Sequence, residues 1–222
     1  MSIIKKIFSK KQQNYINELK ELFANDFNVM VIPTYQIFNN AKSVQLRYPY
    51  DSTQEYYCIR EDYIFQDFDT AYYLRCIKES KCIIIEIRNL GSLIFTNHLR
   101  SDLFYILQRD YRTYVNYVFE GNDTGGYFKI LKDGKIDRKI ASYLIMDGIK
   151  NYPETRGKPC EYEIKKENIW KVDMNAKYIA DMLEGFYKEE ILELFDYYIG
   201  LSNMKNENIQ NIFIYSLKTD EK

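Results

Sequence analysis

The chain is poor in the side chains from which enzymes commonly build active sites. His98 is the only histidine among 222 residues. Neither Ser92 nor Ser101 lies in a nucleophile-elbow context, so a hydrolytic triad is not indicated, and we expect His98 to make local hydrogen bonds. Gly125-Gly126 lacks both the Lys-Ser/Thr and the helix start of a phosphate-binding loop. We therefore predict no catalytic residue and no cofactor.

Cysteine is also scarce, with residues at positions 58, 76, 82 and 160 and no Cys-x-x-Cys pair. Cys76 and Cys82 would lie nearly across a predicted hairpin, but no second pair completes a zinc site. Asp133-Gly134-Lys135 lacks the further oxygen ligands of a calcium loop. We predict no bound metal, and free, buried thiols, as expected without a secretion signal.

Neither a charge excess nor a long apolar run is present. With 31 basic and 32 acidic side chains, the net charge is −1, so we expect no direct nucleic-acid partner. The apolar segment 82–87 is strand-sized and interrupted by Glu86, and the N-terminal residues do not resemble a signal peptide. We expect no membrane partner and a cytoplasmic location. Hydrophobic residues make up 46% of the chain, which is ordinary for a globular protein.

Tyrosine is what the chain has in excess, with 22 residues beside 13 phenylalanines and one tryptophan. Tyrosine-rich surfaces suit recognition, because the ring buries a large area with few rotatable bonds. An AT-rich genome, whose codons favour Tyr, Ile, Asn and Lys together, is the alternative explanation. Both explanations stay open at this point.

Apolar spacing predicts four helices. Residues 11–24 form the first and residues 99–109 the second, and residues 176–183 and 191–199 close the chain. Gly200 suits the C-cap of the last helix.

Extended segments lie between these helices. Alternating or β-branched patterns predict strands at 43–48, 55–60, 71–77, 81–88, 92–96, 111–120 and 211–217. The runs 71–77 and 81–88 flank Glu79-Ser80 as a hairpin, the Ile83-Ile84-Ile85 core indicates a strand covered on both faces, and the run 211–217 is predicted as an edge strand. The stretch 147–171, with Pro153, Gly157 and Pro159, is predicted to be irregular.

Asp133-Gly134 predicts a two-residue hairpin turn, because both residues tolerate positive φ. This turn would set Leu131 opposite Ile136 and Lys129 opposite Arg138. The mixture of hairpins and helices predicts an α+β fold: a mainly antiparallel sheet with an N-terminal helix, a mid-chain helix and C-terminal helices packed on it. We expect a single domain over residues 1–222, with residues 1–80 as an alternative N-terminal subdomain.

Residues 127–163 carry a recognisable pattern. Aromatic Tyr127 and Phe128 precede the turn Asp133-Gly134-Lys135, Arg138 lies on the following strand, and a Gly157-x-Pro159 loop leads to Glu161 or Glu163. With the preceding helix and strand in the same order, this pattern resembles that of bacterial polymorphic-toxin immunity proteins over residues 82–200.

The resemblance implies a non-enzymatic protein that neutralises a cognate protein toxin by covering its active site. A central hot spot surrounded by complementary charge supplies such binding. The residues that we expect at the partner interface are charged: Asp62, Asp67, Asp69, Lys129, Arg138, Asp181 and Glu184, with Glu189 and Glu190 beside the last two. The acids would suit a basic nuclease as the toxin.

Two other hypotheses stay open. A metal- or carboxylate-dependent nuclease or hydrolase could use acid pairs such as Asp67/Asp69, Glu161/Glu163 or Glu189/Glu190, although neighbouring acids are common on solvated surfaces. A basic and aromatic strip at 109–117 would suit base stacking on one exposed face, but its alternation favours a half-buried strand. The third hypothesis is a phage or mobile-element protein that inhibits a host system.

Overall fold

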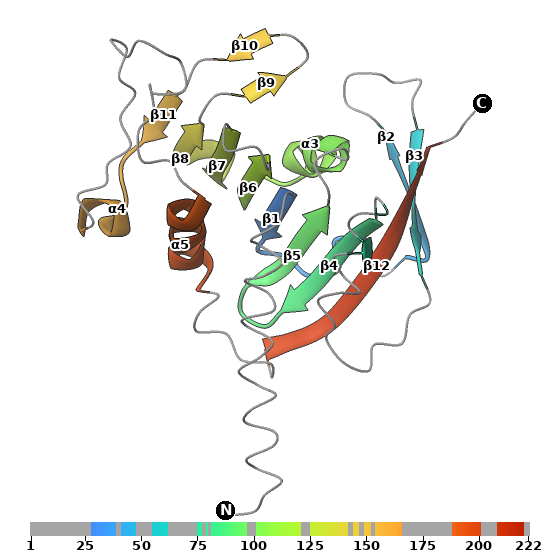
Figure 1. Cartoon of the computed structure of the whole chain (residues 1–222). Helices are drawn as coiled ribbons and strands as arrows, with labels where there is room; N and C mark the ends of the chain where they lie inside the picture. Colours follow the sequence, from blue (N-terminus) through green and yellow to red (C-terminus); the bar gives the residue numbers. More distant parts are fainter. Residues whose placement is uncertain are drawn as a thin grey trace, which may run out of the picture.

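The computed structural model describes thirteen segments of the chain (Figure 1). They are residues 28–38, 41–47, 55–61, 75–76, 79, 81–96, 101–120, 125–141, 144–146, 149–151, 154–165, 188–200 and 208–219. The helices predicted at 11–24 and 176–183, and His98, lie outside these segments.

Ten strands form one sheet, and every neighbouring pair in it is antiparallel. The spatial order is β11-β8-β7-β6-β1-β5-β4-β12-β3-β2. The strands in chain order are β1 (Asn28–Ile32), β2 (Ser43–Arg47), β3 (Glu55–Arg60), β4 (Lys81–Ile87), β5 (Gly91–Thr96), β6 (Tyr114–Glu120), β7 (Gly125–Lys132), β8 (Lys135–Ala141), β11 (Glu154–Gly157) and β12 (Ile209–Thr219). A separate hairpin pairs β9 (Leu144–Met146) with β10 (Ile149–Asn151).

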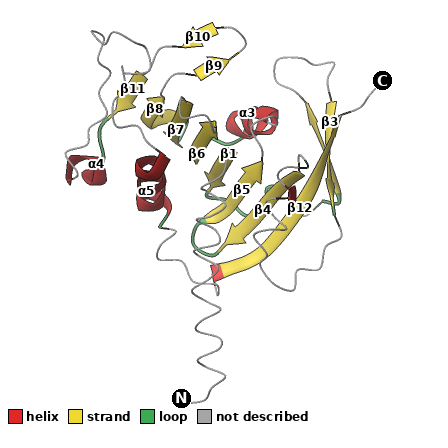
Figure 2. Ribbon diagram, in the orientation of Figure 1, coloured by secondary structure: helices red, strands yellow, loops and turns green. Residues whose placement is uncertain are grey.

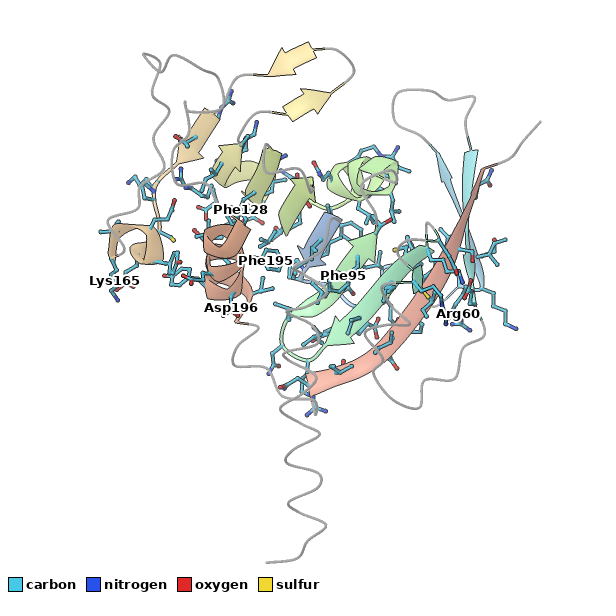
Figure 3. The ribbon with its side chains drawn as sticks, in the orientation of Figure 1. Arg60, Phe95, Phe128, Lys165, Phe195 and Asp196 are labelled. Atoms are coloured by element: carbon cyan, nitrogen blue, oxygen red, sulfur yellow. The ribbon has the colours of Figure 1, made fainter. Side chains whose placement is uncertain are left out.

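One apolar cluster lies on each face of the sheet, because successive side chains of a strand point to opposite faces. Helix α5 (Lys188–Ile199) covers one face through Leu194, Phe195 and Ile199, which pack with Phe95 and Phe128 (Figures 1 and 3). We call this the α5 face. Helix α3 (Ser101–Asp110) covers the other, the α3 face, through three buried side chains, Leu103, Ile106 and Leu107.

Helices α3 and α5 occur where the periodicity predicts them. Helix α5 ends at a C-cap on Gly200, whose φ is 68° and whose amide donates to the carbonyl of Asp196 at 2.6 Å. Strand β4 is buried on both faces from Cys82 to Ile87, as its apolar run predicts. The general α+β architecture, a mainly antiparallel sheet with helices, is therefore confirmed (Figure 2).

Three local predictions are wrong. Arg75 and Cys76 are helical rather than extended, so β4 forms its hairpin with β5 and not with the segment before it. Strand β12 is no edge strand, since it lies between β4 and β3. Cys76 and Cys82 belong to the clusters of opposite faces; both are buried thiols outside any disulfide, and Cys160 is a half-buried one.

The Asp133-Gly134 turn forms as predicted, with φ of 51° and 80° at its two central residues. Leu131 pairs with Ile136, as expected from the turn. A bulge then places Asp137 as an extra residue on β8, so Arg138 pairs with Ile130, and Lys129 pairs with Lys139. The predicted Lys129–Arg138 pair is wrong, because one inserted residue moves every later side chain to the opposite face.

The stretch predicted to be irregular contains three regular elements. They are β10, β11 and the short helix α4 (Glu161–Lys165). β11 extends the sheet beyond β8, and α4 follows it directly, beside α5 (Figure 1). This end of the sheet carries the site described next.

Candidate functional site

The residues predicted to contact a partner divide into two groups. Asp62, Asp67, Asp69, Asp181 and Glu184 lie outside the described residues. Lys129 and Arg138 are described, on the adjacent strands β7 and β8. Because of the bulge at Asp137, these two basic side chains lie on opposite faces of the sheet.

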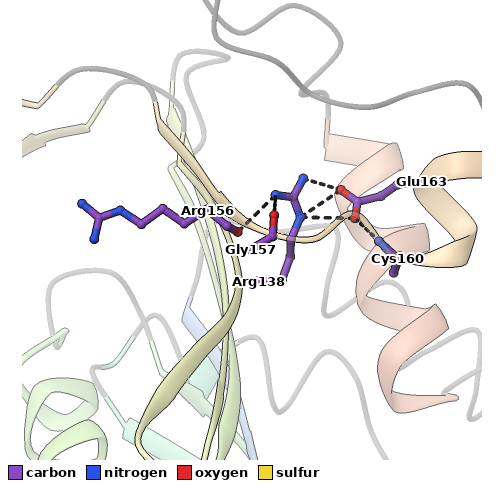
Figure 4. A network of polar contacts seen from close by, with 5 residues as sticks. All are labelled: Arg138, Arg156, Gly157, Cys160 and Glu163. Carbon is purple, nitrogen blue, oxygen red and sulfur yellow. Dashed lines mark hydrogen bonds and ion pairs between the residues drawn. The ribbon is translucent and has the colours of Figure 1, made fainter.

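Arg138 forms a buried ion pair with Glu163 of α4 on the α5 face (Figure 4). Its Nη2 donates to Glu163 Oε1 at 2.6 Å, and its Nε donates to Oε1 at 3.1 Å and to Oε2 at 3.2 Å. Arg138 is 2% exposed and Glu163 is fully buried. A planar guanidinium matches a carboxylate in this way, and the charge on each group makes these hydrogen bonds stronger than neutral ones.

The remaining polar atoms of the pair hold the loop between β11 and α4 (Figure 4). Arg138 Nη1 donates to the carbonyls of Arg156 at 3.1 Å and Gly157 at 3.4 Å. The amide of Cys160 donates to Glu163 Oε2 at 2.7 Å. Gly157 has a φ of 83°, and a Cβ there would lie 2.0 Å from the carbonyl oxygen of Asp137. The loop can therefore follow this path only with glycine at position 157.

This geometry revises the expectation for Arg138. Its side chain is enclosed within the chain, so it is removed from the surface that a partner could contact. Glu161 and Glu163 do not form an acid pair, because Glu163 binds Arg138 while Glu161 is exposed and binds Lys165 at 2.7 Å. The motif residues at 138, 157 and 163 thus fix α4 against the sheet.

A row of aromatic rings leads from the core beneath α5 to the surface beside α4. The distances between ring centres are 5.7 Å from Phe128 in the core to Tyr198, 5.4 Å from Tyr198 to Tyr197, and 5.8 Å from Tyr197 to Tyr162. The hydroxyl of Tyr162 also donates a hydrogen bond to Glu193. Burial, followed by the neighbouring Cys160 thiol, raises the pKa of Tyr198, so this phenol stays neutral. We call Tyr162, Tyr197 and Tyr198 the tyrosine patch.

The outer part of the tyrosine patch is open to solvent. Tyr197 is 47% exposed, and Ile164 on α4 is 57% exposed. Lys165 extends from the same helix and interacts with Tyr197 electrostatically (Figure 3). Tyrosine is one of the residue types enriched in the hot spots of protein interfaces, and Tyr197 is both exposed and in contact with a ring anchored on the core.

Lys129 lies on the α3 face and is half-buried. Its Nζ lies 5.4 Å from the centre of the Tyr114 ring, in the geometry of a cation–π contact. Burial lowers the pKa of Lys129. The ammonium group of Lys129 is therefore partly removed from solvent.

The strip at 109–117 spans the end of α3, a turn and the first part of β6; its strand part is half-buried, as the alternation favours. Tyr114 and Asn116 are buried, Arg109 pairs with Asp110 at 2.7 Å, and Arg112 donates to the carbonyl of Asp133 at 3.1 Å. Arg112 thus supports the β7–β8 turn, and the strip is divided between a helix end, a turn and buried positions of β6 rather than one stacking face.

The sequence prediction missed the surface residues of the tyrosine patch. The helical spacing that places Leu194, Tyr198 and Ile199 on the inner side of α5 leaves Tyr197 on the outer side. The helical spacing alone could therefore have identified Tyr197 as an exposed tyrosine next to the more buried Tyr198. Tyr162 had no such signal, because α4 was not predicted.

Among the described residues, none of the helices has the length and apolar character needed to cross a membrane. The described segments also contain no group of three or more His, Cys, Asp or Glu side chains placed to hold a metal ion. Comparisons of this chain with models of protein families, with curated proteins and with solved structures find no match.

Proposed function

We propose that this protein is a non-enzymatic, cytoplasmic binding protein that neutralises a bacterial protein toxin by covering the toxin's active site. The observation that carries the proposal is the tyrosine patch with the exposed Ile164 on α4. Tyrosine rings at the centre of an interface supply much of the affinity of protein complexes. The resemblance of residues 127–163 to immunity proteins supports the choice of a toxin as the partner.

The support beneath the patch suits tight binding. Tyr197 contacts Tyr198, which in turn contacts the core residue Phe128. The buried Arg138–Glu163 pair holds α4, and with it Tyr162 and Ile164. A surface fixed before association loses little conformational entropy on binding, and this improves affinity.

Co-expression with the toxin encoded beside the gene for this chain tests the proposal. The wild-type chain should restore growth, and Tyr197→Ala should lose protection. Removing a hot-spot residue costs about 2 kcal/mol or more, which weakens affinity about 30-fold. Calorimetric titration of the purified pair would measure this change directly.

Two isoleucines provide a matched control. Ile164→Ala should weaken binding, while Ile59→Ala should not, although Ile59 on β3 is also exposed, at 38%. Unchanged killing by the toxin in the presence of the wild-type chain would reject the proposed function. Equal weakening by both isoleucine substitutions would reject the α4–α5 surface as the interface.

A further inference from the structure

One row of side chains crosses the α3 face and changes from apolar to cationic along its length. Strand register aligns its members directly opposite one another. In order from β5 to β11 they are Ile94, Met30, Asn116, Lys129, Lys139 and Arg156. Ile94 and Met30 are in the apolar cluster beneath α3, whereas the last three carry positive charge. We call Asn116, Lys129, Lys139 and Arg156 the cationic row.

The two lysines of the cationic row face each other on neighbouring strands. Directly opposite residues have Cβ atoms about 5 Å apart, and like charges at that spacing oppose pairing. Lys129 and Lys139 are both half-buried. Burial, then Arg156 and then Lys129, lowers the pKa of Lys139. Positive charge is thus concentrated on this part of the α3 face.

Arg156 extends the row on the same face. Its side chain points away from the Arg138–Glu163 pair, on the other side of β11 (Figure 4). It pairs with Lys139 in the register and is exposed. With strands about 4.8 Å apart, three cations lie side by side, with the two inner ones half-buried and the outer one open to solvent.

Asn116 gives an independent indication of a ligand. It is 1% exposed, and its side-chain oxygen has no hydrogen-bond partner among the residues that the structure describes. It lies directly opposite Lys129, at the inner end of the three cations. Buried polar atoms are nearly always hydrogen-bonded, so an orphaned one suggests an absent donor.

We propose that the cationic row binds a small phosphorylated molecule that also carries a hydroxyl or amino group. Its phosphate oxygens would accept from Lys129, Lys139 and Arg156, and its donor would lie at the Asn116 oxygen. The half-buried position of both lysines suits a small ligand better than a nucleic-acid strand, as does the net charge of −1. This site lies on the face opposite the Arg138–Glu163 pair, and it is independent of the proposed function.

Calorimetric titration with ADP and with inorganic pyrophosphate, at low ionic strength, tests this inference. ADP supplies both phosphates and donors, whereas pyrophosphate supplies the anion alone. Both should bind the full chain, and ADP should bind more tightly. Lys139→Met should weaken ADP binding by about ten- to a hundredfold, the value of one charge-assisted hydrogen bond.

Lys132→Met is the matched control, because it removes the same charge from the same hairpin. Lys132 is exposed and pairs with Asp137 at 2.7 Å, so its loss should change affinity less than about twofold. Asn116→Ala should remove the advantage of ADP over pyrophosphate. Thermal unfolding of each variant would verify that it is folded.

Several results would overturn the inference. The wild-type chain could fail to bind either probe, or Lys132→Met could weaken binding as much as Lys139→Met, which would indicate non-specific attraction. Tighter binding of a single-stranded oligonucleotide than of ADP would reject a small ligand.

Discussion

The strands β7, β8 and β11 carry basic side chains on both faces, but the surroundings of these side chains differ between the two faces. On the α5 face, Arg138 is buried, and every hydrogen bond that we describe for it ends on Glu163 or on a nearby carbonyl. On the α3 face, Lys129, Lys139 and Arg156 lie side by side, and like charges oppose one another. The first arrangement pairs a buried cation with its counterion, whereas the second brings like charges to neighbouring positions.

The largest effect should come from breaking the buried pair on the α5 face. Glu163→Ala leaves the Arg138 charge buried without its counterion, and we expect a loss of about 3–5 kcal/mol in the free energy of unfolding. Urea unfolding followed by circular dichroism measures it. Glu161→Ala is the control, because that exposed carboxylate should leave the unfolding midpoint nearly unchanged. Equal midpoints for the two variants would contradict the structural role of the pair.

The loop that the pair holds should be nearly as sensitive. Gly157→Ala places a Cβ 2.0 Å from the Asp137 carbonyl and needs a φ of 83°, so we expect a loss above about 2 kcal/mol. Gly200→Ala at a φ of 68° meets nothing within 4 Å and should cost only about 1 kcal/mol. Thermal unfolding of the two variants separates the close approach from the backbone strain. A larger loss at position 200 would refute this account.

Removing both charges from the α5 face should cost less than removing one. In Arg138→Met/Glu163→Leu no buried ion is left alone, and apolar replacement of such pairs is often neutral. The amide of Cys160 loses its acceptor, so a residual loss of about 1–2 kcal/mol is expected. A double-mutant cycle in urea gives the coupling energy of the two residues. If the double variant were less stable than Glu163→Ala, the unpaired charge of Arg138 would not be the main cause of the loss in the single variant.

The smallest effect concerns pH and the α3 face. The pKa values of Lys129 and Lys139 are lowered from 10.5, so the folded state releases these protons before the unfolded state does. Between the folded and unfolded pKa values the unfolded chain binds more protons, and stability rises with pH. The stability gained by Lys129→Met/Lys139→Met should therefore be largest near neutral pH and shrink as pH approaches 10.5.

Urea unfolding at a series of pH values measures this difference between the wild type and the double variant. Lys132→Met serves again as the control, since its exposed side chain should show no such trend. A difference that is constant across the pH series would mean that the two lysines are not destabilised by their surroundings.

Local patterns were sufficient for much of the architecture. The alternation at 43–48, the apolar run at 81–88 and the Asp133-Gly134 turn each predicted an element that exists, because each depends on neighbouring residues. The position of β12 was predicted incorrectly, since its partners β3 and β4 are distant in sequence and its pattern carries no information about them. Arg75 and Cys76 show the ambiguity of short apolar runs, which suit a helix and a strand equally.

The site was less predictable than the fold. The motif residues Arg138, Gly157 and Glu163 were identified from the sequence, but their structural role was not. The contact between Arg138 and Glu163 joins segments that lie apart in the sequence, and the sequence pattern carries no information about that contact. The bulge at Asp137 decides which basic residue faces α5 and which faces α3, and no residue in the hairpin marks it. Lys139 and Arg156 became candidates only once that register was known.

The position of β12 has a consequence for how the chain reaches its folded state. In the strand order, β3 joins the rest of the sheet through β12, although β2 and β3 leave the ribosome long before β12 does. The β2–β3 hairpin therefore has one unpaired strand edge until β12 has been synthesised and pairs with both β3 and β4. Contacts so distant in sequence slow folding and expose an edge to other chains meanwhile.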